Sequence, residues 1–312
     1  MTTTKLHAAL TAFAAFVSVA VLPSTASAGT VGLKGDRLEV KASKANNRLV
    51  IGRVGDRIRV EERNGDQGLN TSSSRCAREP VKDYIRVECP ASAIRKVTVS
   101  TRGGNDWVVV GRGLPDSRTD RGNCSASKLG AKLVVALGEG NDVAELSAGA
   151  DELRGEGGHD LLMGCAGNDH ISGGPQGDRL SGDRGNDRLR AQGGSDSIVG
   201  CSFDPDDVNY PRGENGEDHL DGGEGNDFLF GCGGLDTFSA GGGDDNLNTR
   251  DDVGEVADCG EGSDVIYLDP EDSRPGCETV TDCVTDNYPI GPDTGLPECF
   301  GPRISFRRTR AG

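Results

Sequence analysis

Apolar and polar residues follow a fixed pattern of nine places between residues 137 and 199. In this register the sixth place is always aspartate, and the eighth is a branched apolar residue in every block except the first, which has Ala144. The fourth place is glycine except in the block where Gln176 precedes Gly177. A fixed period indicates structural units that stack on their neighbours. The offset of two from the aspartate to the apolar residue predicts a short strand with the apolar side chain turned inward.

The same period resumes after an interruption at residues 200–212 and runs to Asn248. Isolated copies lie on either side, at Gly104–Asp106 with Val108 and at Gly262–Asp264 with Ile266. Eleven copies between residues 137 and 248 keep the register. The repeat therefore organises the middle of the chain.

Glycine-rich turns that end in aspartate are typical of calcium sites. Ca²⁺ takes six to eight oxygen ligands at about 2.3–2.6 Å, from carboxylates and backbone carbonyls. Several carbonyls reach one ion only through tight turns with positive φ, which glycine adopts at no steric cost. We therefore expect several Ca²⁺ ions and no other cofactor. The candidate metal ligands are the aspartates in the sixth place: Asp142, Asp151, Asp160, Asp169, Asp178, Asp187, Asp196, Asp218, Asp227, Asp236, Asp245 and Asp264.

The blocks resemble the hemolysin-type calcium-binding nonapeptide of RTX proteins, G-G-x-G-x-D-x-U-x. This resemblance implies an all-β fold, a right-handed parallel β-roll (β-solenoid) in which two nonamers form one coil. Residues 18 apart would then stack at the strand spacing of roughly 4.8 Å, and each ion would take oxygens from two consecutive coils. The aspartates would line two edges, with Asp142, Asp160, Asp178 and Asp196 on one and Asp151, Asp169 and Asp187 on the other.

Two structural alternatives stay open. A disordered acidic linker is disfavoured, because a linker has no reason to hold aspartate and an apolar residue at strict offsets. A metal-free β-solenoid is the stronger alternative. It is favoured by degenerate turns at Ser147–Ala148 and Pro175–Gly177, which make Asp151 and Asp178 weaker ligand candidates than Asp169.

The rest of the chain divides around this roll. Residues 1–28 are typical of a secretory signal peptide, with Lys5, an apolar run and the sequence Ala26–Ala28. We expect cleavage after Ala28, a secreted protein and no membrane span.

Residues 29–100 alternate with period two and predict a small β-domain that caps the roll, with a ligand-binding module as the alternative. The remaining expected divisions are a transition at 101–136, the roll at 137–267 with interruptions at 200–212 and 249–258, and a C-terminal cap with a flexible basic tail at 268–312.

Ten cysteines fit an oxidising compartment and disulfides rather than zinc, because no C-x-x-C pair occurs. Local pairs are the expected ones: Cys76–Cys89, Cys259–Cys277 and Cys283–Cys299. Cys165 and Cys201 would lie two coils apart on one edge, about 9.6 Å, which exceeds the usual span of a disulfide unless the loop bends back.

Composition favours a binding protein over an enzyme. A hydrophobic content of 34% and 48 glycines leave a thin core, so ions and disulfides must help to hold the fold. A net charge of −16 argues against nucleic-acid binding. No nucleophile elbow, zincin motif or phosphate loop occurs.

We expect a secreted, non-enzymatic calcium-binding protein. The alternatives are a calcium-stiffened adhesin that binds a cell-envelope or matrix polymer, and a polysaccharide-acting enzyme built on a parallel β-solenoid.

Overall fold

The computed structural model describes residues 28–63, 68–81, 84–111, 129–201, 216–251, 253–268, 272–273 and 277. The expected signal peptide, the basic tail and the Cys283–Cys299 pair lie outside these residues. Apart from one 3₁₀ turn, η1 (Ala91–Ala93), the regular elements of the described part are β-strands. No helix there is long and apolar enough to cross a membrane.

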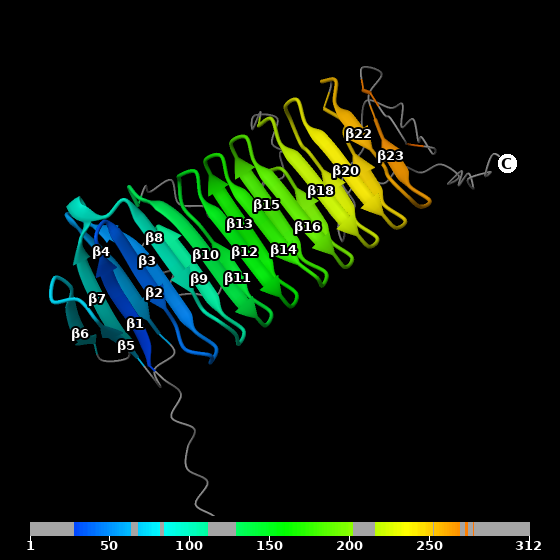
Figure 1. Cartoon of the computed structure of the whole chain (residues 1–312). Coiled ribbons are helices and arrows are strands. Elements are labelled where there is room, and N and C mark those ends of the chain that lie inside the picture. Colours follow the sequence, from blue (N-terminus) through cyan, green and yellow to red (C-terminus); the bar gives the residue numbers. More distant parts are fainter. Residues whose placement is uncertain are drawn as a thin grey trace, which may run out of the picture.

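The strands form two sheets that run side by side along an elongated stack (Figure 1). The order in the first sheet is β22 (Val256–Asp258), β20 (Thr237–Gly242), β18 (His219–Glu224), β16 (Arg188–Gly193), β14 (His170–Gly174), β12 (Glu152–Gly157), β10 (Lys132–Glu139), β8 (Lys96–Ser100), β2 (Arg37–Lys41), β1 (Gly29–Lys34) and β5 (Leu69–Thr71). The order in the second sheet is β23 (Val265–Tyr267), β21 (Asn246–Asn248), β19 (Phe228–Phe230), β17 (Ser197–Val199), β15 (Arg179–Arg184), β13 (Leu161–Ala166), β11 (Val143–Glu145), β9 (Trp107–Gly111), β3 (Arg48–Val54), β4 (Arg57–Glu62), β7 (Tyr84–Pro90) and β6 (Ala77–Val81).

The parallel strands stack in the register that the repeat predicts. Leu153 pairs with Ile171 and Leu162 with Leu180, so equivalent residues of successive coils are 18 apart. Each coil gives one strand to each sheet, and the apolar residues in the eighth place fill the space between the sheets. None of these twelve side chains, from Ala144 to Ile266, is more than 3% exposed. The expected all-β, parallel β-roll is confirmed.

Irregularities in the sequence are accommodated between coils. Leu189 pairs with Leu220, 31 residues later, so the 13-residue insertion leaves the pairing intact. After Asn248 the offset becomes 19, since Leu247 pairs with Ile266. The slip is therefore one residue, and the stack continues through it.

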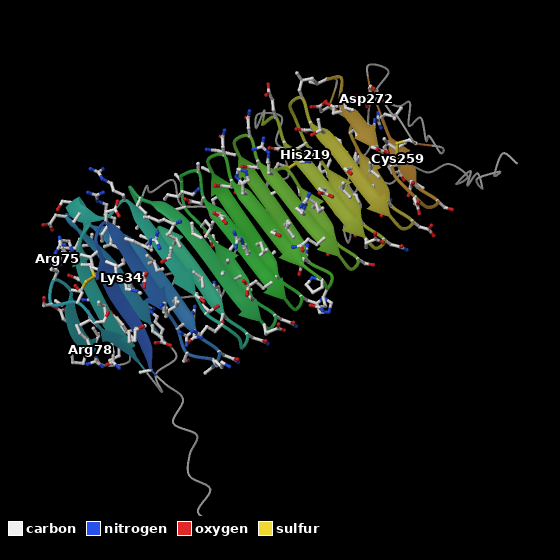
Figure 2. The ribbon with its side chains drawn as sticks, viewed as in Figure 1. Lys34, Arg75, Arg78, His219, Cys259 and Asp272 are labelled. Carbon is white, nitrogen blue, oxygen red and sulfur yellow. A yellow bond between two sulfur atoms is a disulfide. The ribbon has the colours of Figure 1, made fainter. Side chains whose placement is uncertain are left out.

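The stack begins well before residue 137. Strands β2, β8 and β10 are parallel neighbours, and so are β3, β9 and β11. The two sheets therefore run without a break across the expected boundary at residue 100, and two coils precede the nonapeptide array. Beyond them the pairing turns antiparallel, with β1 against β2 and β4 between β3 and β7. Figure 2 labels Arg75 and Arg78 at this end of the stack and Asp272 and Cys259 at the other.

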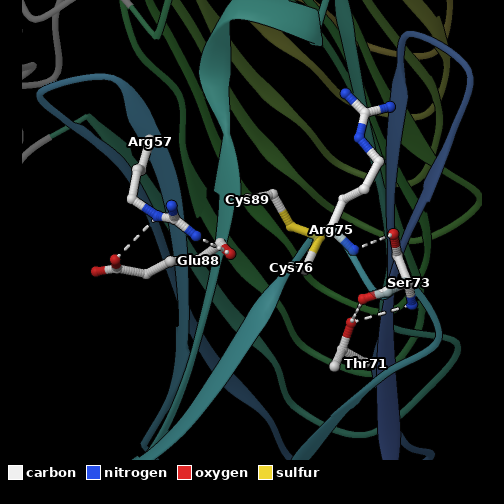
Figure 3. Close-up of a disulfide and its surroundings, with 7 residues drawn as sticks. All are labelled: Arg57, Thr71, Ser73, Arg75, Cys76, Glu88 and Cys89. Carbon is white, nitrogen blue, oxygen red and sulfur yellow. Dashed lines mark hydrogen bonds and ion pairs between the residues drawn. A yellow bond between two sulfur atoms is a disulfide. The ribbon is translucent and has the colours of Figure 1, made fainter.

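Three disulfides are defined among the described residues. The predicted pairs Cys76–Cys89 (Figure 3) and Cys259–Cys277 are confirmed. Cys201 is bonded to Cys232 at a Cα separation of 5.9 Å, a pair that we did not predict. Cys232 is 31 residues away along the chain, but removal of the insertion from the count puts the two cysteines one coil apart on the same edge. Cys165 is also disulfide-bonded.

Candidate metal centre

Each aspartate in the sixth place lies immediately before a strand, at the edge where the chain passes from one sheet to the other. Asp160 precedes β13 of the second sheet, and Asp169 precedes β14 of the first. Most of the turns that lead to them have left-handed backbone at the second and fourth places. At Cys165 and Gly167, for example, φ is 79° and 144°. These conformations bend the chain tightly enough to place the aspartate over its own turn.

Hydrogen bonds join these aspartates into two ladders. In each step, Oδ1 of an aspartate accepts the backbone N–H of the residue that occupies the sixth place one coil earlier. The first ladder has N···O distances of 2.6–3.0 Å and runs through Asp106, Asp142, Asp160, Asp178, Asp196, Asp227, Asp245 and Asp264. The second has distances of 2.7–2.9 Å and runs from the N–H of Leu133 through Asp151, Asp169, Asp187, Asp218 and Asp236.

All twelve predicted aspartates therefore lie in the ladders, on the two edges that the sequence implied. The degenerate turns do not remove Asp151 or Asp178 from this arrangement. Asp151 Oδ1 accepts the N–H of Leu133 at 2.9 Å, and Asp178 Oδ1 accepts that of Asp160 at 2.8 Å. The backbone spacing of the coils, rather than the identity of each turn residue, sets the position of the carboxylate.

Bonds of the same kind involve residues that were not among the predicted ligands. Asp106 Oδ1 accepts the N–H and the side-chain amide of Asn47, at 2.6 and 2.8 Å. Its isolated motif, with Val108 two places on, was the signal that could have identified it. At the other end, the N–H of Glu255 donates to Asp272 Oδ1 at 3.1 Å. Glu255 carries the same signal, because it is two places before the buried Ala257.

The second oxygen of most ladder aspartates has no hydrogen-bond donor. Oδ2 is buried without a partner in ten of them: Asp106, Asp142, Asp151, Asp160, Asp169, Asp178, Asp187, Asp196, Asp227 and Asp245. A buried polar atom without a partner is costly, and a buried charge much more so. A hard cation at each edge would remove this penalty.

A glycine in the first place of several turns makes room for this second oxygen. A Cβ built on Gly164 would lie 2.5 Å from Asp169 Oδ2 and 3.0 Å from the carbonyl oxygen of Gly182 in the next coil. The carboxylate and a backbone carbonyl from two coils thus approach the same glycine. Among the described residues no three histidine, cysteine, aspartate or glutamate side chains form a metal cluster. Carbonyl oxygens would therefore have to supply much of the shell, which is a donor set that suits Ca²⁺.

Burial changes the acidity of these carboxyls. The twelve aspartates are at most 7% exposed. Desolvation raises the pKa of Asp169, the N–H of Asp151 partly opposes it, and the charges of Asp187 and Asp151 add to the rise. The pKa is raised to about 8 for Asp169 and Asp218, to about 7 for Asp142, Asp236 and Asp245, and to about 6 for Asp151, Asp160, Asp178, Asp187 and Asp196.

These shifts predict how the metal-free protein responds to pH. A carboxyl whose pKa is higher in the folded state stabilises the fold when protonated, and this stabilisation is lost as pH rises from about 4 through the folded pKa. We expect metal-free protein to melt at a higher temperature at pH 5 than at pH 8, and saturating Ca²⁺ to abolish or reverse the difference. Thermal melts by far-UV circular dichroism at both pH values would measure this. Equal melting temperatures for the metal-free protein at the two pH values would contradict it.

Three segments of the chain, residues 137–171, 172–200 and 212–247, match the family model of the RTX calcium-binding nonapeptide repeat. No curated protein and no solved structure matches the chain. The matched segments coincide with the coils whose aspartates form the central part of both ladders. The resemblance that the sequence pattern indicated is confirmed, and the chain carries RTX calcium-binding nonapeptide repeats.

Proposed function

We propose that the protein is a secreted, non-enzymatic calcium-binding protein whose repeat turns bind several Ca²⁺ ions between stacked coils and order on binding. The observation that carries this proposal is the row of buried Oδ2 atoms without a donor on both edges of the stack. We assign the twelve predicted aspartates as ligands, one to each turn. Their Oδ1 atoms fix the carboxylates to the neighbouring coil, and their Oδ2 atoms face the ion.

The two oxygens of each carboxylate thus have separate roles. The hydrogen bond from Asp151 N to Asp169 Oδ1 is 2.8 Å long, and it orients the carboxylate whether or not an ion is present. The Oδ2 atom supplies the charge that Ca²⁺ neutralises. Because successive aspartates of one ladder raise one another's pKa, as Asp187 and Asp151 do for Asp169, the ion also removes repulsion between coils. Binding and folding are coupled when a metal satisfies a site in this way.

Several features support secretion and a binding role. The disulfides at Cys76–Cys89, Cys201–Cys232 and Cys259–Cys277 fit an oxidising compartment.

His159, His170 and His219 are exposed and bond to neighbouring coil residues at 2.7–3.3 Å. These contacts hold the histidines on the surface of the stack. The antiparallel strands at the N-terminal end would act as a cap, because they cover the last parallel strand edges.

Removal of calcium tests the proposed function. We expect the metal-free chain at low ionic strength and pH 8 to lose most of its strand signal in far-UV circular dichroism, because unscreened carboxylates repel one another along each ladder. Calorimetric titration with Ca²⁺ should restore the signal with affinities of about 10⁻⁴–10⁻³ M per site, the range of extracellular modules. Mg²⁺ is the control ion. An unchanged spectrum without calcium, and no heat on titration, would favour a metal-free solenoid.

The position of an aspartate within its ladder should decide its importance. Asp169 has ladder partners on both sides, Asp151 and Asp187, whereas Asp264 follows the one-residue slip and its Oδ1 bonds to Asp245. Removal of a middle unit of a stack breaks two interfaces, and removal of an end unit breaks one. We expect Asp169→Ala to raise the Ca²⁺ midpoint of folding several-fold more than Asp264→Ala and to lower its cooperativity. Equal midpoints in the two titrations would mean that the sites act independently.

A further inference from the structure

The coil after Asn248 departs from the repeat consensus, yet it continues the stack. Val256 of β22 pairs with Thr237, and its N–H donates to the carbonyl of Asp236 at 3.2 Å. The same bond joins Thr237 N to Asp218 O one coil earlier, at 2.9 Å. Glu255 therefore occupies the sixth place of its coil, directly before the strand, where the preceding coils of the second ladder have aspartate.

The carboxylate of Glu255 is buried without a donor. Glu255 is 2% exposed, and neither Oε1 nor Oε2 of its side chain has a hydrogen-bond partner. The carboxyls of Asp272 and Asp251 lie close enough to interact with it. An ionised carboxylate at this place requires a cation, and without one it must hold a proton.

The two neighbouring carboxylates are held by hydrogen bonds of their own. Asp272 Oδ1 accepts the N–H of Glu255 at 3.1 Å, and its Oδ2 accepts the hydroxyl of Thr249 at 2.7 Å. Asp251 accepts the N–H groups of Val253 and Gly234, both at 2.9 Å. The position of these carboxylates is thus fixed without any bond to the side chain of Glu255, whose own oxygens have no hydrogen-bond partner.

The segment that carries Asp272 is fastened to the last coils. Ser273 N donates to Glu255 O at 2.8 Å, and Ala257 N donates to Ser273 O at 2.9 Å. The Cys259–Cys277 disulfide joins the same two stretches of chain at a Cα separation of 4.9 Å. Figure 2 shows Asp272 and Cys259 at the same end of the stack. The carboxylate group at this end is therefore built by covalent and backbone constraints.

We propose that Glu255 and Asp272 bind a further divalent cation, Ca²⁺, with Asp251 beside them and backbone carbonyls completing the shell. The site rests on the proposed function of the repeats, but it lies beyond the segments that match the repeat family. The segment that carries Asp272 is joined to the last coils by the Cys259–Cys277 disulfide. Rigidity of a site raises its calcium affinity, so this ion should be among the most tightly bound.

The number of bound ions tests the proposal. Equilibrium dialysis of the full chain against radioactive calcium would compare the wild type with Glu255→Gln and Asp272→Asn. The matched control is Glu261→Gln, which removes the same charge from an exposed side chain in the adjacent turn. We expect both site variants to bind one ion fewer and to lose a tight binding step, and the control to bind as the wild type does. Far-UV circular dichroism in saturating Ca²⁺ would verify that each variant is folded.

The outcomes separate this site from the repeats. If both folded site variants bind as many ions as the control, with the same affinities, Glu255 is a buried carboxylic acid and the terminal site is wrong. If wild-type protein binds no calcium, the proposed function of the repeats fails first, and the terminal site fails with it. Loss of one ion in Glu255→Gln and Asp272→Asn alone would support the terminal site.

Discussion

The structure depends on how one carboxylate is held at each turn. Every ladder aspartate uses Oδ1 to accept an N–H from the coil before it, and in ten of them Oδ2 is left buried without a donor. At Asp169 this oxygen lies so close to Gly164 that a Cβ built there would be 2.5 Å from it. The regular spacing of the aspartates and their raised pKa values follow from this arrangement. A stack built in this way has an internal charge on each edge that only protons or cations can neutralise.

The apolar core alone is thin. The eighth place of each nonapeptide contributes one enclosed side chain, such as Leu162 or Leu180, and successive nonapeptides repeat this contribution without widening the core. The three disulfides with both cysteines among the described residues lie near irregular parts of the stack. Cys76–Cys89 joins strands of the antiparallel end, Cys201–Cys232 connects the coils that flank the insertion, and Cys259–Cys277 closes the end beyond the slip. These three bonds thus support the stack where the nonapeptide repeat is absent or irregular.

Sequence periodicity was sufficient to predict the central coils, because aspartate and an apolar residue at a fixed offset report directly on backbone position. It was insufficient where the same backbone is built from other residues. Residues 37–54 form a coil whose sixth place is Asn47, so the pattern that we followed was missing, and period-two alternation suggested a separate domain. Glu255 was overlooked because a single inserted residue displaced it from the register, although Ala257 still marked the interior position. The Cys201–Cys232 bond became visible only when the insertion was known to leave the stack intact.

The central claim is that the unpartnered Oδ2 atoms are calcium ligands, and anomalous X-ray scattering from crystals grown in Ca²⁺ tests it most directly. The account predicts anomalous peaks along both edges, between consecutive coils, at about 2.3–2.6 Å from the Oδ2 atoms of aspartates such as Asp160 and Asp169. Peaks confined to the outer surface of the sheets, or edges without peaks at saturating calcium, would contradict it. In that case the ladder carboxyls would be neutral acids, and the fold would be a metal-free solenoid.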